Sequence, residues 1–200
     1  MSGNIPHGWN FIVELPRRSY AKNNETAVVE KSWKTELPDG VGFGGQKFFF
    51  PEGLTACAEV QWIEEQLLSV RVTVEGTVKG ECARCLADAK LAISDNLVYL
   101  YHLRGLEFGK DSKIQSDEGF MPVEVDYWGR TLSLSDQVWE TLLTLLPVKL
   151  LCKEDCAGLC PECGHDLNKG ACSCKAQETD PRLEILRGIF PVGANYPLDR

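Results

Sequence analysis

The residues with the clearest chemistry are cysteines in the last quarter of the sequence. Six of the nine cysteines fall between Cys152 and Cys174, with gaps of three, three, two, eight and one residues. Thiolates at such short spacings are typical ligands of zinc, which takes four of them in a tetrahedral structural site. The candidate metal ligands are Cys152, Cys156, Cys160, Cys163, Cys172 and Cys174.

The centre of this segment has the form of a zinc knuckle, Cys160-Pro-Glu-Cys163-Gly164. Two thiolates separated by two residues can turn back onto one ion, and Gly164 can adopt the positive φ that this tight turn requires. The segment is too short and too polar to bury a core of its own, so a bound ion is expected to order it. Disulfides and free thiols are the alternatives. The total of nine cysteines is odd, so disulfide pairing would leave one thiol over, which argues against a disulfide framework.

A further cysteine pair lies upstream, in the motif Cys82-Ala-Arg84-Cys85. The motif lies between two runs with strand periodicity, whereas a thioredoxin-like dithiol needs its first cysteine at a helix N-terminus, where the dipole stabilises the thiolate. A thiol oxidoreductase is therefore the weaker interpretation, and Arg84 is interpreted as a structural or partner-facing cation. The role of the motif stays open on these grounds.

The sequence also leaves open which cysteines share an ion. Cys160 and Cys163 are the most secure pair, and His165 beside them is a candidate for one further ligand. Adding the upstream pair to the six clustered cysteines gives eight thiolates, which would fill two tetrahedral sites if the fold brings residues 82–85 beside the C-terminal segment. The remaining candidate pairs are Cys152 with Cys156 and Cys172 with Cys174.

The charge balance bears on the class of partner. The chain has 21 Lys and Arg against 29 Asp and Glu, a net charge of −8, and the cysteine-rich segment is not locally basic. Affinity for a phosphate backbone comes mostly from Lys and Arg that displace counterions, so direct RNA binding, as by a zinc-ribbon nucleic-acid binder, is expected to be weak or absent. A basic protein partner fits the negative net charge of the chain better. The sequence contains no nucleophile–base pattern that would predict an enzyme or a small-molecule substrate.

The elements that must position the cysteines are predominantly strands. Apolar residues alternate with polar ones from Leu68 to Val78 and again from Leu91 to Tyr101, which predicts neighbouring antiparallel strands. Gly76 interrupts the first run and predicts a bulge or bend. Shorter strands are expected at residues 9–15 and 121–127, and the glycines at 42, 44 and 45 are interpreted as a loop.

One long helix is expected to pack on this sheet. Leu134, Val138 and Leu142 share one helical face, the residues from Ser133 to Asp136 have capping-box spacing, and Pro147 ends the helix. A short final helix is expected from Pro181 to Ile189. The predicted fold is α+β, with a sheet-and-helix domain at residues 1–150, a cysteine-rich segment with a terminal helix at 151–190, and a tail at 191–200.

Two of these motifs resemble one known family. The run from Gly76 to Leu86, which contains Cys82-Ala-Arg84-Cys85, resembles the central motif of the YceD family, the bacterial proteins of large ribosomal RNA subunit accumulation. The segment from Cys152 to Leu183 resembles the cysteine-rich ending of many members. The resemblance implies a non-enzymatic factor in ribosome biogenesis that binds a ribosomal protein or a precursor of the large subunit, with zinc as an accessory to the fold.

The N-terminal ten residues have neither the basic start nor the apolar core of a secretory signal, and no apolar run is long enough to span a membrane. We therefore expect a cytoplasmic protein. In that reducing compartment, dense cysteine usage indicates metal binding rather than disulfides.

Overall fold

The computed structural model describes residues 5–6, 8–17, 27–105 and 119–174. The chain divides after Cys156 into a first unit (Met1–Cys156) and a second unit (Ala157–Arg200), which we describe separately. The boundary predicted between residues 150 and 151 stays a prediction. The predicted helix at 181–189 and the tail at 191–200 lie outside the described residues.

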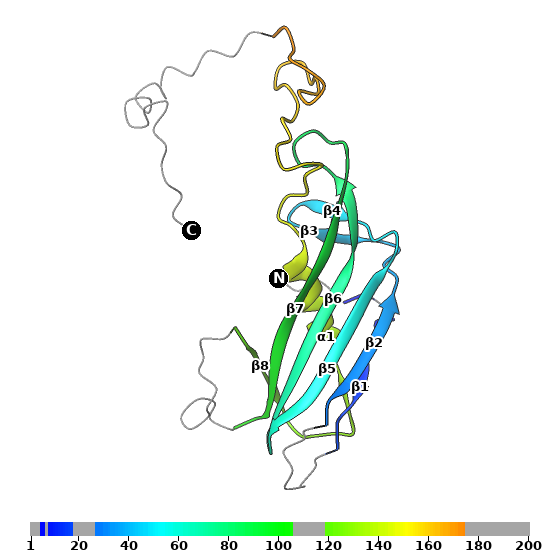
Figure 1. Cartoon of the computed structure of the whole chain (residues 1–200), viewed down its shortest axis with the longest axis vertical. Coiled ribbons are helices and arrows are strands. Elements are labelled where there is room, and N and C mark those ends of the chain that lie inside the picture. Colours follow the sequence, from blue (N-terminus) through cyan, green and yellow to red (C-terminus); the bar gives the residue numbers. More distant parts are fainter. Residues whose placement is uncertain (1–4, 7, 18–26, 106–118, 175–200) are drawn as a thin grey trace, which may run out of the picture. The chain divides into compact units, whose positions relative to one another are not determined.

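Strands dominate the first unit, as expected from the alternating sequence (Figure 1). A five-stranded sheet has the order β2-β5-β6-β7-β8, with β7 and β8 parallel and the other neighbours antiparallel. Strands β1 and β9 form one two-stranded pair, and β3 and β4 form another. The described elements are β1 (Ile12–Glu14), β2 (Val29–Thr35), β3 (Val41–Phe43), β4 (Gln46–Phe48), β5 (Leu54–Glu64), β6 (Leu67–Glu81), β7 (Asp88–Leu103), β8 (Met121–Val125), β9 (Thr131–Ser133) and α1 (Ser135–Leu145).

The two long strands β6 and β7 confirm the predicted neighbouring pair. Their register runs without a shift from the pair Leu67 and His102 to the pair Glu81 and Asp88, so the predicted bulge at Gly76 is wrong. A Cβ at Gly76 would collide with the Leu54 side chain on β5. The glycine therefore leaves room for this side chain where β5 and β6 lie close together.

The glycine-rich region predicted as a loop is in fact a hairpin. Strands β3 and β4 are joined by Gly44 and Gly45, which have φ angles of 58° and 80°. Two successive residues with positive φ make the turn whose twist matches a two-residue hairpin, and Gly-Gly is a strong signal for it. A bridge between Phe49 and Lys79 ties this hairpin to β6.

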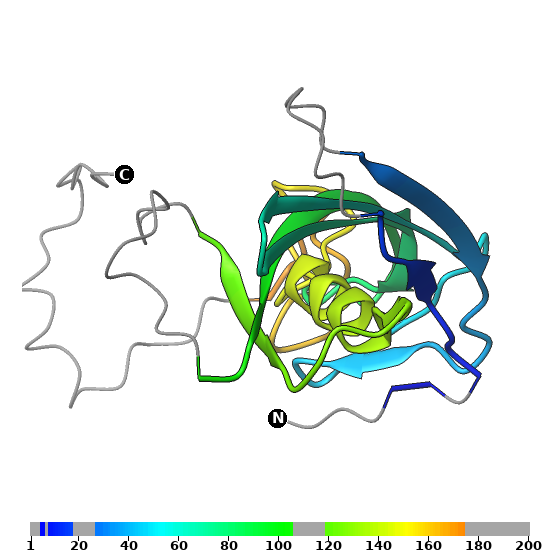
Figure 2. The ribbon, with the colours of Figure 1, turned by 90° about the horizontal axis from the view of Figure 1, so that it is seen from below.

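Helix α1 lies against the concave face of the sheet (Figure 2). The predicted apolar face is confirmed, because Leu134, Val138 and Leu142 are fully buried. The predicted capping box is wrong: Leu134 is the N-cap residue and its side chain offers no capping oxygen. The Tyr99 hydroxyl of β7 instead fastens the helix to the sheet through the Thr141 hydroxyl, at 3.1 Å.

The length of helix α1 bears on whether a helix in the described part of the chain could span a membrane. Helix α1 has 11 residues, and no helix in that part is long and apolar enough to cross a bilayer.

Candidate metal centres

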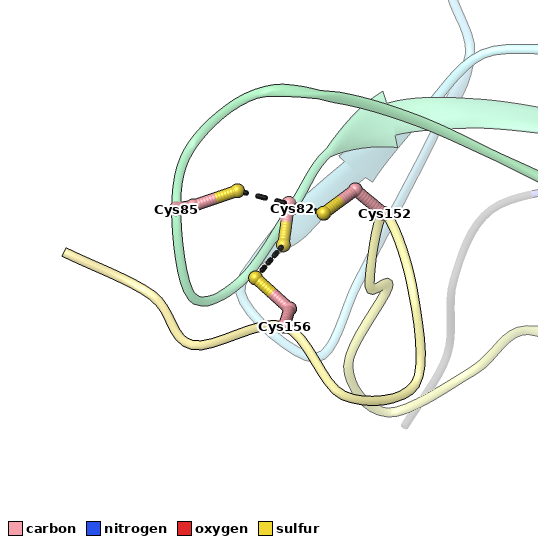
Figure 3. A group of neighbouring side chains, drawn as sticks. All are labelled: Cys82, Cys85, Cys152 and Cys156. Carbon is pink, nitrogen blue, oxygen red and sulfur yellow. Dashed lines mark hydrogen bonds between the residues drawn. The ribbon is translucent and has the colours of Figure 1, made fainter. Parts of the chain in front are cut away.

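The structure places four cysteines from two distant segments around one point of the first unit (Figure 3). We call Cys82, Cys85, Cys152 and Cys156 the first cluster; their sulfur atoms all lie within 4.8 Å of one another. The Sγ atoms of Cys82 and Cys156 are 3.8 Å apart, and those of Cys85 and Cys152 are 3.6 Å apart. The upstream motif is therefore joined to the first two cysteines of the C-terminal segment.

The turn between β6 and β7 presents the first two sulfurs. The N–H of Cys82 donates to the Ala87 carbonyl at 2.8 Å, and the N–H of Leu86 donates back to the Cys82 carbonyl at 2.9 Å. These bonds close a tight loop from which both thiols point inward. The N–H of Ala83 then donates to the Leu150 carbonyl at 2.8 Å, which brings the segment after α1 beside the turn.

The side chains of Arg84 and Gln46 connect the segments that carry the first cluster, and only the structure reveals these contacts. The Arg84 guanidinium donates to the Cys156 carbonyl at 2.8 Å, so Arg84 has a structural role in this turn. The Gln46 amide joins the two segments, because its nitrogen donates to the Glu81 carbonyl and its oxygen accepts the N–H of Leu150, each at 3.1 Å. Nothing in the sequence singled out Gln46, which lies in the stretch interpreted as a loop.

The thiols of the first cluster differ in acidity. Burial alone raises the pKa of the Cys82 thiol, but backbone N–H groups, first among them that of Arg84, outweigh it and lower the pKa to about 6. Burial, followed by contact with the Cys85 thiol, raises the pKa of Cys152 to about 12. The Cys82 thiol is therefore more acidic than an ordinary cysteine, whereas the raised pKa of Cys85 and of Cys152 favours their protonated forms unless a cation stabilises the thiolates.

A second group of four cysteines lies in the second unit. We call Cys160, Cys163, Cys172 and Cys174 the second cluster; their sulfur atoms likewise lie within 4.8 Å of one another. Backbone N–H groups, first that of Cys163, lower the pKa of Cys160 to about 7, whereas contact with the Cys163 thiol and then burial raise the pKa of Cys174 to about 12. The uneven acidity of the first cluster is thus repeated here.

Hydrogen bonds between backbone groups shape the second cluster. Gly164 has a φ of 70°, which confirms the predicted positive φ, and its N–H donates to the Cys160 carbonyl at 2.9 Å. The N–H of Cys160 donates to the His165 carbonyl at 2.8 Å, and His165 is not a member of the cluster. The side chain of Asp166 accepts from the N–H and the side-chain amide of Asn168, and these bonds lower the pKa of Asp166.

All six C-terminal candidates and the upstream pair are therefore placed in clusters, but the six do not form one unit. The segment from 152 to 174 divides, with its first two cysteines in the first unit and its last four in the second. This is the two-site arrangement that the sequence left as an alternative. Cys57 belongs to neither cluster; its thiol donates to the Ser32 hydroxyl at 3.3 Å.

The division changes what a single substitution is expected to do. Cys163→Ser removes one sulfur from the second cluster alone, so we expect loss of order in residues 157–174 and no change in the sheet. Proteolysis of the C-terminal segment, monitored together with the far-ultraviolet circular dichroism of the sheet, tests this expectation. Collapse of the strand signal in this variant would show that the two clusters are not independent.

Comparison with known proteins agrees with these motifs. The family model described as "Large ribosomal RNA subunit accumulation protein YceD" matches residues 70–190, a range that contains both clusters. Curated relatives named "Uncharacterized protein Mb2951c" of Mycobacterium bovis and "Uncharacterized protein Rv2926c" of Mycobacterium tuberculosis are each 31% identical over 108 residues, 54% of this chain and 48% of theirs. The chain spans about half the length of these relatives, and no solved structure matches it significantly. Because the family match covers more than half of the sequence and includes both cysteine motifs, this chain belongs to the YceD family.

Proposed function

We propose that each cluster binds one structural zinc ion through four thiolates. Tetrahedral coordination at a Zn–S distance of ~2.3 Å places sulfurs ~3.8 Å apart. The sulfur–sulfur distances in the first cluster, 3.8 Å and 3.6 Å, agree with this separation. They are far from the ~2.05 Å of a disulfide, so the geometry supports coordination over pairing.

The donor sets fit zinc chemically as well. Four sulfur ligands favour a soft or borderline cation such as zinc over calcium or magnesium, which prefer oxygen. With all four positions taken by protein, the site has no open position for water or substrate, which is the pattern of a structural centre. A bound cation would stabilise the thiolate forms of Cys152 and Cys174, whose pKa is raised by burial and by contact with neighbouring thiols.

For the protein as a whole, we propose a non-enzymatic factor in biogenesis of the large ribosomal subunit. The family match carries this proposal, since the description of the family concerns accumulation of large-subunit ribosomal RNA. The partner is a ribosomal protein or a precursor particle, as the net charge of −8 favours a basic protein surface over a bare phosphate backbone. The compartment is the cytoplasm, where free thiols persist to bind zinc.

Thiol oxidoreduction is the competing function, because the low pKa of Cys82 would suit a reactive thiolate. Two observations favour a structural role instead. Cys82 is fully buried, and the motif joins two strands rather than opening a helix. Rapid alkylation of Cys82 in the metal-loaded protein would support the oxidoreductase.

The test of the assembly function is co-sedimentation. The tagged protein is expected in sucrose-gradient fractions that hold immature large subunits and not in mature ribosomes. Its removal from the cell is expected to lower large-subunit ribosomal RNA relative to small-subunit RNA. If the protein sediments alone and the RNA ratio does not change, the assembly function is wrong.

A further inference from the structure

The two cysteine knuckles of this chain differ at the residue that follows the second cysteine, which is Leu86 in one and Gly164 in the other. In each, the residue after the second cysteine donates its N–H to the carbonyl of the first cysteine at 2.9 Å. That residue has a φ of 70° at Gly164 and 60° at Leu86. Gly164 adopts this conformation without strain, whereas a branched side chain there is strained by contact between its Cβ and the backbone.

Leu86 is the one non-glycine residue with positive φ among those the structure describes. Packing does not explain the leucine, because 63% of its surface is exposed. The turn does not need it either, since the equivalent turn in the second unit is closed by Gly164. A strained backbone and an exposed apolar side chain at one position point to a requirement outside the folding of the chain.

Leu86 does not stand alone on this surface. Phe49, which follows β4, and Val148, which follows α1, are 43% and 73% exposed. Together with Leu86 they line one open cavity of about 910 Å³ beside the first cluster. Three segments of the first unit thus bring large apolar side chains to one place, which is typical of an interaction site rather than of scattered surface residues.

The charges around this cavity indicate the partner. Lys79 is paired with Asp88 at 3.4 Å, while Lys47 and Lys149 make no ion pair within the described residues. The Lys47 ammonium lies 5.3 Å from the centre of the Phe49 ring, which keeps it at the edge of the apolar surface. Among the described residues, Glu81 is the acidic lining residue that makes no ion pair. Two unpaired lysines therefore face one unpaired carboxylate, and the rim of the cavity has a net charge of +1.

This balance favours a protein over RNA. One excess positive charge at the rim is too little to hold a phosphate backbone, because such binding needs several Lys or Arg side chains that each displace counterions. A single carboxylate, by contrast, could pair with Lys47 or Lys149 at the edge of an otherwise apolar contact. Apolar side chains at the centre with charges at the rim are the usual arrangement of a protein interface.

We propose that Leu86, with Phe49 and Val148, is the docking site for a short apolar segment of a partner protein that carries an acidic side chain next to it. The proposal rests on the proposed function, because the partner is taken to be a protein of the precursor large subunit. Leu86 is the anchor that enters the partner, and the zinc knuckle holds it outward.

The first experiment compares Leu86→Gly with the wild type. The variant is expected to keep both metal ions and a midpoint of thermal unfolding no lower than that of the wild type, since glycine relieves the strained φ. Its affinity for purified precursor particles is expected to fall at least about tenfold, as for the loss of an interface anchor. Leu86→Met should retain most of the binding.

Leu91→Ala is the matched control, because Leu91 is an exposed leucine on β7 that does not line the cavity. It should bind like the wild type. Equal binding by the wild type and Leu86→Gly would overturn the docking site while leaving the proposed function intact. Lower stability of Leu86→Gly would overturn the argument from strain.

A crosslinking experiment identifies the occupant and separates the two proposals. A benzophenone amino acid in place of Val148 is expected to crosslink in cells to an apolar, acid-containing peptide of a large-subunit ribosomal protein, and to lose this product when Leu86→Gly is added. Crosslinks to RNA, or none, would overturn the docking proposal. If the wild type fails to co-sediment, a Leu86-dependent crosslink to another protein would uphold the docking site and reject only the assembly function.

Discussion

Replacing Cys82 by serine is expected to remove one metal ion per chain and to lower the free energy of unfolding of the first unit by more than about 4 kcal/mol. Cys82 is fully buried, and its sulfur lies 3.8 Å from that of Cys156. Structural zinc sites contribute roughly 10–16 kcal/mol of binding free energy in zinc-finger peptides, so loss of one ligand outweighs most single changes in a core. The sheet should still form, because most of its buried apolar side chains, such as Val60, Val70 and Val72, lie on strands outside the cluster.

Cys57→Ser is the matched control for this prediction. Cys57 lies outside both clusters, so the variant should keep two ions and nearly the stability of the wild type. Metal analysis by mass spectrometry and urea denaturation followed by circular dichroism give the two readouts. A Cys82→Ser protein that still holds two ions would mean that the first cluster is not a metal site.

The second large effect is expected at Gly80, where no cysteine is touched. A Cβ at this position would lie 3.0 Å from the Lys47 carbonyl and 3.1 Å from the Leu150 side chain. The branched methyl groups of Gly80→Val would force these groups apart, and overpacking of this kind typically costs about 2 kcal/mol. Because Leu150 bonds to Ala83 of the knuckle, the displacement should also weaken metal binding at the first cluster.

Gly42→Val provides the control, since Gly42 is an exposed glycine of β3 and a Cβ added to it would have no neighbouring atom within 4 Å. Valine suits an exposed strand, so this variant should be no less stable than the wild type. Competition with a chromogenic zinc chelator measures the affinity of each protein. Equal zinc affinity in Gly80→Val and the wild type would show that contact between β4, β6 and the segment at 150 does not position the cluster.

The two clusters are expected to have different parts in the function. The first is built into the sheet domain and holds the turn that ends in Leu86, whereas the second orders a separate short segment around a knuckle closed by Gly164. The proposed docking surface beside the first cluster is therefore expected to depend on the ion that we propose for that cluster. Loss of the second ion should leave that surface unchanged.

Much of this protein is determined by local sequence. Alternation of apolar and polar residues specifies β6 and β7, the apolar face from Leu134 to Leu142 specifies α1, and the spacing of Cys160 and Cys163 with Gly164 specifies a knuckle. These features depend on residues within about ten positions of one another, where periodicity and backbone preference suffice. The Gly44-Gly45 hairpin is also encoded locally, but its flanking strands are only three residues long, which is too short for apolar alternation to indicate them.

The tertiary structure decided which thiols lie together in each cluster. Cys85 and Cys152 are 67 positions apart, and their meeting depends on the packing of α1 on the sheet and on bonds from Gln46 and Leu150 that have no sequence signature. The same holds for the surface that joins Leu86 to Phe49 and Val148. Ligand type and turn geometry follow from neighbours in the chain, whereas the grouping of ligands follows from long-range packing, which local patterns do not specify.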